Sequence, residues 1–286
     1  MRVMRLGQPG EERPVVRVDD GIVEVGDVVG DIDAAFFAGG GVERLRDVVA
    51  ERVAAGAVRP LGDERIGAPI ARPHQILCVG LNYSDHAAET GQAVPDEPIL
   101  FSKSPNTLVG PDDDVLIPPG SQKTDWEVEL GIVIGRQVTY LADERAATEA
   151  IAGYVLSNDV SERAYQLERG GQWLKGKSAP TFNPCGPWLA TPDEFDDVED
   201  LGLWLDVNGE RRQDGSTATM IFGPATIVHY ISQFMTLEPG DLINTGTPPG
   251  VGMGLDPQVY LRPGDVMELG GEGLGRQRQR VAATQV

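Results

Sequence analysis

Apolar and polar residues alternate near the start of the chain. The alternation runs through residues 15–25 on both sides of an Asp-Gly dipeptide at 20–21, which predicts a β-hairpin. Over residues 42–55 the apolar positions recur instead at helical spacing, which predicts a helix. Several prolines interrupt the stretch that follows. We therefore expect residues 1–72 to form a small N-terminal α/β unit and residues 73–286 to form the main domain.

After residue 75, short apolar runs are separated by polar clusters and turns rather than by long amphipathic helices. A hairpin is expected at 203–211, turning on Asn208-Gly209, and a helix is expected over 224–234, with proline in its first turn. Other strands are predicted at 76–81, 128–134, 154–156, 237–243 and 266–269. The chain has no regular strand–helix alternation and no internal repeat. The pattern predicts a β-rich α+β fold rather than a Rossmann-like sheet.

Composition restricts the classes of partner. The 286 residues include 44 acidic and 24 basic side chains, which gives a formal net charge of −20. Such a surface repels phosphate backbones and anionic membranes, so we expect neither nucleic acid nor a membrane as a partner. Cys78 and Cys185 form no CxxC pair, and the first residues lack the apolar run of a signal peptide. These features favour a cytoplasmic protein.

Residues 171–178 match the phosphate-binding expression G-x-x-x-x-G-K-[ST]. A phosphate-binding loop needs a buried strand before it and a helix after it. Residues 164–170 are polar and helix-like, however, and residues 179–184 contain two prolines that would interrupt the required helix. The match therefore does not predict a nucleotide site.

Carboxylates at two positions provide the strongest local signal. Glu127 and Glu129 stand two residues apart as an apolar run begins, so they face the same side of the expected strand. Two like charges this close repel unless a cation lies between them, although an exposed strand face would also tolerate them. Asp159 follows a second apolar strand. Three carboxylates without clustered Cys or His favour Mg²⁺, with Mn²⁺ or Ca²⁺ as alternatives.

His86 and Glu89 form a candidate catalytic pair. They lie three residues apart where a strand leads into a short helix, so they share a helix face. The carboxylate could orient the imidazole, which would then act as the base that activates a water molecule. The alternative is a surface ion pair without function. The other histidines, His74 and His229, have no such neighbour in the sequence.

Five motifs, in this order along the chain, resemble those of the fumarylacetoacetate hydrolase superfamily. The resemblance covers the chain from about residue 73 to residue 281, and an opening segment resembles the N-terminal extension of bacterial members. Residues 220–235 are most similar to the branch that hydrolyses diketo-deoxy-sugar acids and to acylpyruvases. The five motifs are Gly-Leu-Asn-Tyr-Ser-Asp-His at 80–86, Asp-Trp-Glu-Val-Glu-Leu at 125–130, Asn-Asp-Val-Ser-Glu-Arg at 158–163, Gln-Trp-Leu-Lys-Gly-Lys at 172–177 and Asn-Thr-Gly-Thr-Pro-Pro-Gly-Val-Gly at 244–252.

This resemblance implies a mixed β-sandwich roll, a homodimer and a bound Mg²⁺ or Mn²⁺. Lys103 would be a bystander or would support the site from behind. The implied site residues are the metal ligands Glu127, Glu129 and Asp159, the catalytic residues His86, Glu89 and Lys177, and the substrate-binding residues Arg163, Gln166 and Thr247.

Two positions depart from the family pattern. Pro180 precedes Thr181 where many members have aspartate before the threonine, and Leu81 stands where several acylpyruvate-cleaving members have arginine. Both departures concern the substrate, and neither touches the predicted metal ligands.

The sequence thus predicts a metal-dependent hydrolase that cleaves a C–C bond of a small anionic β-diketo acid with water activated by His86. The first alternative is a decarboxylase, isomerase or hydratase that uses the same metal site on a 2-oxo or 2-hydroxy-dienoic acid. The second alternative is a non-catalytic protein whose carboxylates hold a structural metal.

Overall fold

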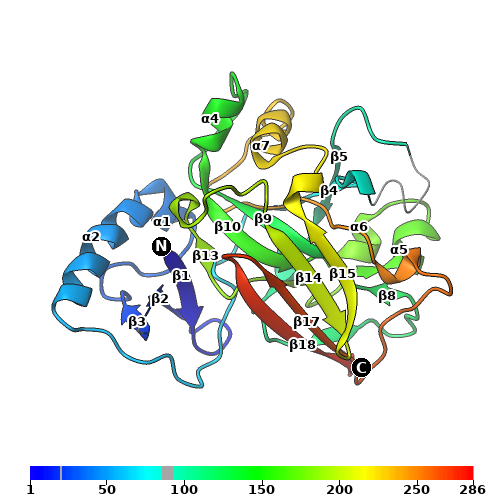
Figure 1. The fold of residues 1–286 in the computed structure, drawn as a ribbon, viewed down its shortest axis with the longest axis horizontal. Coiled ribbons are helices and arrows are strands. Elements are labelled where there is room, and N and C mark those ends of the chain that lie inside the picture. The colour runs from blue at the N-terminus through cyan, green and yellow to red at the C-terminus, as the bar shows by residue number, and fades with distance from the viewer. Residues whose placement is uncertain (20, 86–92, 286) are drawn as a thin grey trace.

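The computed structural model describes residues 1–19, 21–85 and 93–285 (Figure 1). A sheet of nine strands runs through this part of the chain, in the spatial order β3-β2-β1-β13-β10-β9-β16-β4-β5. These strands are β3 (Gly21–Glu24), β2 (Arg13–Val18), β1 (Arg2–Leu6), β13 (Leu189–Ala190), β10 (Ile151–Asn158), β9 (Val128–Ile134), β16 (Leu242–Asn244), β4 (Ile76–Gly80) and β5 (Ile99–Lys103). The sheet is mixed, because β16 pairs parallel with β4 and antiparallel with β9.

A second sheet of five strands has the order β15-β14-β17-β18-β7. Its strands are β15 (Glu210–Ser216), β14 (Gly202–Val207), β17 (Val266–Gly271), β18 (Gly275–Ala283) and β7 (Val115–Ile117). The predicted hairpin turning on Asn208-Gly209 is confirmed as β14–β15, and Asn208 has the positive φ of 54° that this turn requires. Two short pairs complete the strands: β11 (Ser161–Glu162) with β8 (Thr124–Asp125), and β12 (Asn183–Pro184) with β6 (Leu108–Val109).

Helices lie at the periphery of the two sheets (Figure 1). The predicted helices at 42–55 and 224–234 are confirmed as α2 and α7. Within the described residues, no helix is both long and apolar enough to cross a membrane. The α-helices are α1 (Ala34–Ala38), α2 (Gly41–Ala54), α4 (Glu144–Thr148), α5 (Arg163–Leu167), α6 (Leu174–Lys177) and α7 (Pro224–Ser232), and the 3₁₀ turns are η1 (Pro105–Thr107), η2 (Pro192–Glu194), η3 (Thr217–Thr219) and η4 (Gly252–Gly254).

The main hydrophobic core fills the space between the two sheets. Leu130 of β9, Leu156 of β10, Leu205 of β14 and Leu269 of β17 are all fully buried there. Because successive residues of a strand face opposite sides, Leu130 points into this core while Glu129 points to the other face of the larger sheet. The sandwich therefore supports the strand that carries the predicted metal ligands. The β-rich α+β class is confirmed.

The N-terminal residues belong to the larger sheet. The predicted hairpin is confirmed as β2–β3, and β1 joins it to the rest of the sheet by pairing with β13. A second core, on the face away from the sandwich, combines side chains of the N-terminal segment, such as Val3 and Leu45, with Val133 of β9. The division of the chain at residue 72 stays a prediction.

One predicted strand differs from the structure. The stretch 237–243 was expected to be a single strand, but only Leu242–Asn244 forms β16. A Pro239-Gly240 turn separates Leu237 from this strand, and Gly240 has a φ of 85°. Leu237 makes only an isolated bridge to Val138. The apolar pattern correctly predicted that Leu237 and Leu242 are buried. It did not predict the turn that Pro239 and Gly240 form.

Candidate active site

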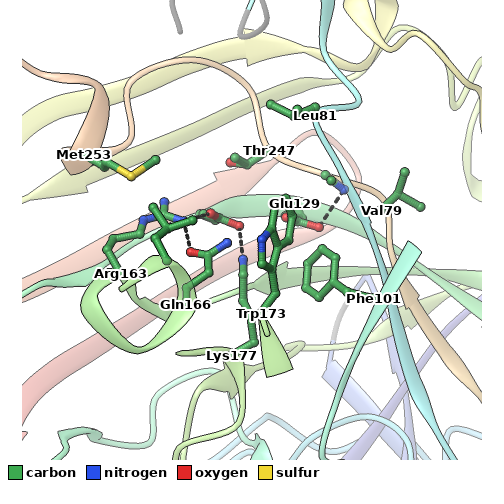
Figure 2. A pocket seen from close by; sticks show the side chains of 14 residues that line it. Val79, Leu81, Phe101, Glu129, Arg163, Gln166, Trp173, Lys177, Thr247 and Met253 are labelled. Carbon is green, nitrogen blue, oxygen red and sulfur yellow. Dashed lines mark hydrogen bonds and ion pairs between the residues drawn. The ribbon is translucent and has the colours of Figure 1, made fainter. Parts of the chain in front are cut away.

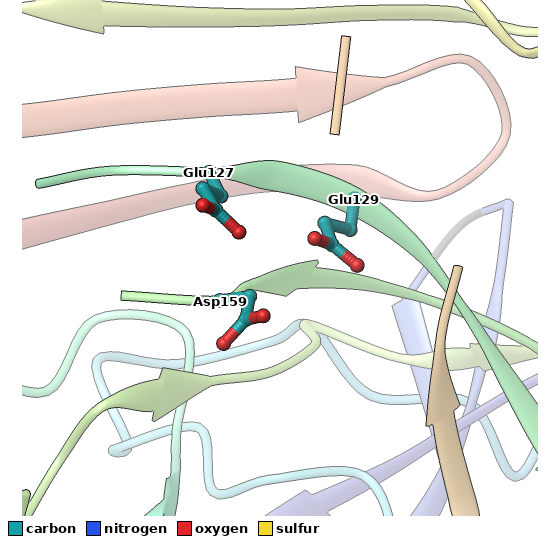
Figure 3. A group of neighbouring side chains, drawn as sticks. All are labelled: Glu127, Glu129 and Asp159. Atoms are coloured by element: carbon teal, nitrogen blue, oxygen red, sulfur yellow. The ribbon is translucent and has the colours of Figure 1, made fainter. Parts of the chain in front are cut away.

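The three predicted metal ligands lie together on the larger sheet (Figure 3). Glu127 stands immediately before β9 and Glu129 lies within it, while Asp159 follows the neighbouring strand β10. One carboxylate oxygen from each residue lies within 4.8 Å of the others, and all three side chains are buried. Strand register explains the arrangement, because the Asp159 N–H donates to the Glu127 carbonyl at 2.9 Å. The prediction that these carboxylates converge is confirmed.

Three buried cations surround this group. Lys177 Nζ lies 2.7 Å from Glu127 Oε2 and 2.7 Å from Asp159 Oδ2. Arg163 Nη1 lies 2.7 Å from Glu127 Oε1. On the other side, Lys103 Nζ forms an ion pair with Asp159 and donates to the carbonyl oxygens of Val160 at 3.1 Å and Phe182 at 2.7 Å. Lys103 is therefore a direct partner of Asp159 rather than a bystander.

Glu127 and Glu129 experience opposite electrostatic environments. Burial alone would raise the pKa of Glu127, but the charges of Lys177 and Arg163 lower it to about 2. The pKa of Glu129 is raised well above its usual value, first by burial and then by the charges of Asp159 and Glu127. Glu129 accepts a hydrogen bond from Gly246 N at 2.7 Å, and within the described residues no ion pair reaches it. A cation bound between the carboxylates would remove this imbalance.

The donor set fits a hard divalent ion. Its three donors are carboxylate oxygens, and sulfur and imidazole donors are absent from the described group. Glu129 is the member of the group that has no ion pair among the described residues. The residues present are therefore suited to Mg²⁺ or Mn²⁺.

Asp125 holds the neighbouring parts of the site together, a role that the sequence analysis did not assign. Its Oδ1 accepts from the N–H groups of Trp126 at 2.9 Å and Gly252 at 2.7 Å, and its Oδ2 accepts from Met253 N at 3.0 Å and Arg163 Nε at 2.8 Å. Asp125 thereby fixes η4 and the Arg163 guanidinium together. The sequence did contain a signal, since Asp125 lies two residues before Glu127 and so continues the same alternation.

Helices α5 and α6 position the polar side chains that lie beside the carboxylates. Gln166 Oε1 accepts from Arg163 Nη1 at 3.0 Å. Gly176 allows α6 to approach α5, because a Cβ at this position would lie 2.6 Å from Gln166 N and from the Glu162 carbonyl oxygen. This close contact brings Lys177 to the carboxylates.

Thr247 lies on the opposite side of the site from Lys177 (Figure 2). Its hydroxyl donates to the Val128 carbonyl at 2.9 Å and accepts from Gln213 Nε2 at 2.7 Å. Its neighbour Gly246 has a φ of 99°, which favours glycine, and this conformation directs the Gly246 N–H to Glu129. The predicted contact between Thr247 and substrate stays a prediction.

A pocket opens onto this group of side chains (Figure 2). It encloses about 110 Å³, which is small for a small-molecule site and suits a compact ligand. Six of the predicted site residues line it: Glu127, Glu129, Arg163, Gln166, Lys177 and Thr247. Asp159 is fully buried and contacts Lys177 from behind.

The predicted catalytic pair, His86 and Glu89, lies outside the described residues. The motif that leads to it is anchored by Asn82, whose side-chain amide donates to the carbonyls of Phe222 at 3.0 Å and Thr245 at 2.8 Å. Asn82 Oδ1 accepts from Phe222 N at 2.9 Å. These bonds join three of the segments that carried the family resemblance.

No helix follows the phosphate-loop match at 171–178. This agrees with the two prolines that were expected to interrupt one. Helix α6 ends at Lys177, and the next element is the two-residue strand β12. Lys177 itself is directed to Glu127 and Asp159.

Comparison with known proteins agrees with this architecture. A family model described as "Fumarylacetoacetate (FAA) hydrolase C-terminal" matches residues 75–282. The chain belongs to this family. A relative from Burkholderia multivorans (strain ATCC 17616 / 249) is 48% identical over 291 residues, which cover 99% of each chain. The family resemblance found in the sequence is thus confirmed.

Solved structures of this family differ in the reactions that they represent. A 5-carboxymethyl-2-hydroxymuconate delta-isomerase from Mycobacterium smegmatis is 32% identical, with a TM-score of 0.78 and full coverage of both chains. A maleylpyruvate hydrolase from Sphingobium sp. SYK-6, solved with manganese(II) and pyruvate, is 26% identical, with a TM-score of 0.82 and full coverage of both chains. Family membership therefore supports an enzyme and leaves the reaction to be argued from the site.

Proposed function

We propose that this enzyme of the fumarylacetoacetate hydrolase family cleaves a C–C bond in a β-diketo acid by hydrolysis. The observation that carries the proposal is the buried group of Glu127, Glu129 and Asp159 at the base of a small pocket, with Lys177 in contact with two of them. The similarity to a maleylpyruvate hydrolase whose structure contains manganese and pyruvate also supports it.

Glu127, Glu129 and Asp159 would hold a divalent cation, Mg²⁺ first and Mn²⁺ second. When bound, the ion would supply Lewis acidity toward the oxygen atoms of the substrate. Lys177 would add a fixed positive charge beside the oxygen on which negative charge develops. Arg163, Gln166 and Thr247 would orient the substrate from the surrounding walls.

The proposed reaction consumes one water molecule. An acylpyruvate, R–CO–CH₂–CO–COO⁻, and water give the acid R–COO⁻, pyruvate and one proton. His86, oriented by Glu89, would remove a proton from the water as its oxygen attacks the distal carbonyl carbon. The bond between that carbon and the CH₂ group then breaks, and its electron pair passes to the CH₂ carbon, which becomes the methyl group of pyruvate after protonation.

Pyruvate release from 2,4-dioxopentanoate tests this proposal directly. The purified protein with Mg²⁺ should release pyruvate, and exhaustive chelation should stop the release. His86→Ala should lose most turnover, whereas His74→Ala, at an exposed residue outside the pocket, is the matched control and should retain it. Full activity after chelation would overturn the metal dependence, and full activity of His86→Ala would overturn the role of the base.

A second candidate reaction is isomerisation or decarboxylation at the same site. It is supported by the similarity to the M. smegmatis delta-isomerase. These reactions need no hydrolytic water, so His86→Ala need not lose turnover. Consumption of oxaloacetate or of a 2-hydroxy-dienoic acid, without pyruvate release from 2,4-dioxopentanoate, would favour this candidate. A purely structural metal would raise the melting temperature while none of these acids was consumed.

A further inference from the structure

The residues that line the pocket are segregated by charge and by depth. All of its charged residues, Glu127, Glu129, Arg163 and Lys177, are buried. Its partly or fully exposed residues are all apolar: Leu81, Phe101, Leu167, Trp173 and Met253. Figure 2 shows Leu81 and Met253 on the opposite side of the charged groups from Lys177. A bound molecule would thus meet charges at the base of the pocket and apolar side chains toward its mouth.

The aromatic part of this apolar wall is well packed. The rings of Phe101 and Trp173 meet edge to face with centroids 5.1 Å apart, and Lys177 Nζ lies 5.0 Å from the Phe101 centroid. Trp173 also approaches Gly80, where a Cβ would lie 2.7 Å from the indole ring. The wall is therefore a built surface that begins directly beside the charged base.

The cations of the pocket are already paired. Arg163 contacts Asp125 and Glu127, and Lys177 contacts Glu127 and Asp159. Among the described residues, no other Lys or Arg lines the pocket. The remaining residues of the chain, 20, 86–92 and 286, contain no Lys or Arg. A second carboxylate on a substrate would therefore lose water against the apolar wall without gaining a Lys or Arg partner.

From this arrangement we infer that the acyl arm of the substrate, the group R of the acylpyruvate, is uncharged and apolar. The inference rests on the proposed function and names its substrate class: monocarboxylic acylpyruvates rather than dicarboxylic ones. Leu81 and Met253 are the specificity-determining residues, because both are partly exposed and present apolar side chains to the pocket.

Two substrates that differ only in their last carbon test the inference. Cleavage of 2,4-dioxoheptanoate gives pyruvate and butanoate, whereas cleavage of 2,4-dioxoheptanedioate gives pyruvate and succinate. With Mg²⁺ and a coupled assay for pyruvate, kcat/KM for the monoacid should exceed that for the diacid by at least about tenfold, the ratio that corresponds to ~1.4 kcal/mol. Equal values, or a preference for the diacid, would overturn the inference and leave the proposed hydrolysis standing.

Variants should reverse this preference. Leu81→Arg should raise kcat/KM for the diacid and lower it for the monoacid, while Leu81→Met, which keeps the wall apolar, should retain the wild-type order. Met253→Arg is an independent second position if Leu81→Arg does not fold. An unchanged ratio in both folded arginine variants would show that this wall does not contact the acyl arm.

Binding separates failure of the inference from failure of the proposed function. If neither acid releases pyruvate, the hydrolysis is wrong, and isothermal titration of the Mg²⁺-loaded protein with both acids decides the inference. Tighter binding of the monoacid would support an apolar arm for whatever reaction the site performs. Equal binding, tighter binding of the diacid, or no binding of either would overturn it.

Discussion

Two groups of charged residues in this protein contain similar chemical groups in different surroundings. At the base of the pocket, Glu127, Glu129 and Asp159 are paired with buried cations or left without one. In the N-terminal segment, Arg13 and Arg59 form ion pairs with Glu24 and Glu64, and each of these side chains is between 33% and 41% exposed. Burial removes solvent screening from the first group, so its charges depend on buried partners, whereas water screens the second.

The difference explains where function resides in an acidic protein. The net charge of −20 arises from side chains spread along the whole chain. Solvent screens most of these charges, so their positions say little about the reaction. The few that lose solvent need a buried partner, and Glu129 has a hydrogen bond from Gly246 N but no ion pair among the described residues.

Removing a carboxylate from the buried group should have the largest effect. Asp159→Ala should lower kcat/KM by at least about 10³-fold and abolish the rise in melting temperature on adding Mg²⁺. Glu24→Gln, which removes an exposed carboxylate from the N-terminal group, is the matched control and should change neither. Activity assays and thermal unfolding with and without Mg²⁺ measure both. A normal Mg²⁺ shift in Asp159→Ala would remove Asp159 from the metal site.

Removing a buried cation should mainly lower stability. Lys103→Met deletes the ion pair to Asp159 and leaves the Val160 and Phe182 carbonyls without their donor, so unfolding free energy should fall by about 3 kcal/mol. Lys123→Met deletes the exposed pair to Glu168 and should leave stability unchanged. Urea unfolding of both variants makes the comparison. Similar losses would mean that burial does not distinguish the two groups.

The N-terminal ion pairs should make a smaller, pH-dependent contribution to the free energy of unfolding. The ion pairs to Arg13 and Arg59 lower the pKa of Glu64 below its usual 4.5. Because the native pKa is depressed, this stabilisation is present above pH 4.5 and is lost as pH falls through the native pKa. Glu64→Gln should cost less than about 1 kcal/mol at pH 7, since solvent screens the pairs. The loss should shrink at pH 3 and in 0.5 M salt, and a larger, salt-insensitive loss would contradict the screening.

Ionic strength should have the smallest effect. The net negative surface should slow the arrival of an anionic substrate, so added salt should raise kcat/KM modestly while kcat stays constant. Initial rates at low substrate concentration, in buffers from 10 to 300 mM salt, measure this. A rate that does not respond to salt would mean that Arg163 and Lys177 dominate the field at the pocket.

The sequence was most informative where one periodic strand carried the chemistry. Alternation placed Glu127 and Glu129 on one face, and the structure confirms that Asp159 joins them. Lys103 could not be assigned in this way, because its partner Asp159 lies 56 residues away and only strand pairing brings them together. The separation of apolar and charged residues in the pocket could not be predicted either, because these residues come from six separate segments of the chain.

The pairing of β1 with β13 has a consequence for the integrity of the larger sheet. A chain lacking residues 1–72 would leave the outer edge of β13 with unpaired backbone N–H and C=O groups, and Val133 and Val155 would lose the apolar side chains that cover them. An uncovered edge of this kind is a template for strand addition between molecules. The N-terminal segment thus covers an edge of β13 to which another strand could otherwise add.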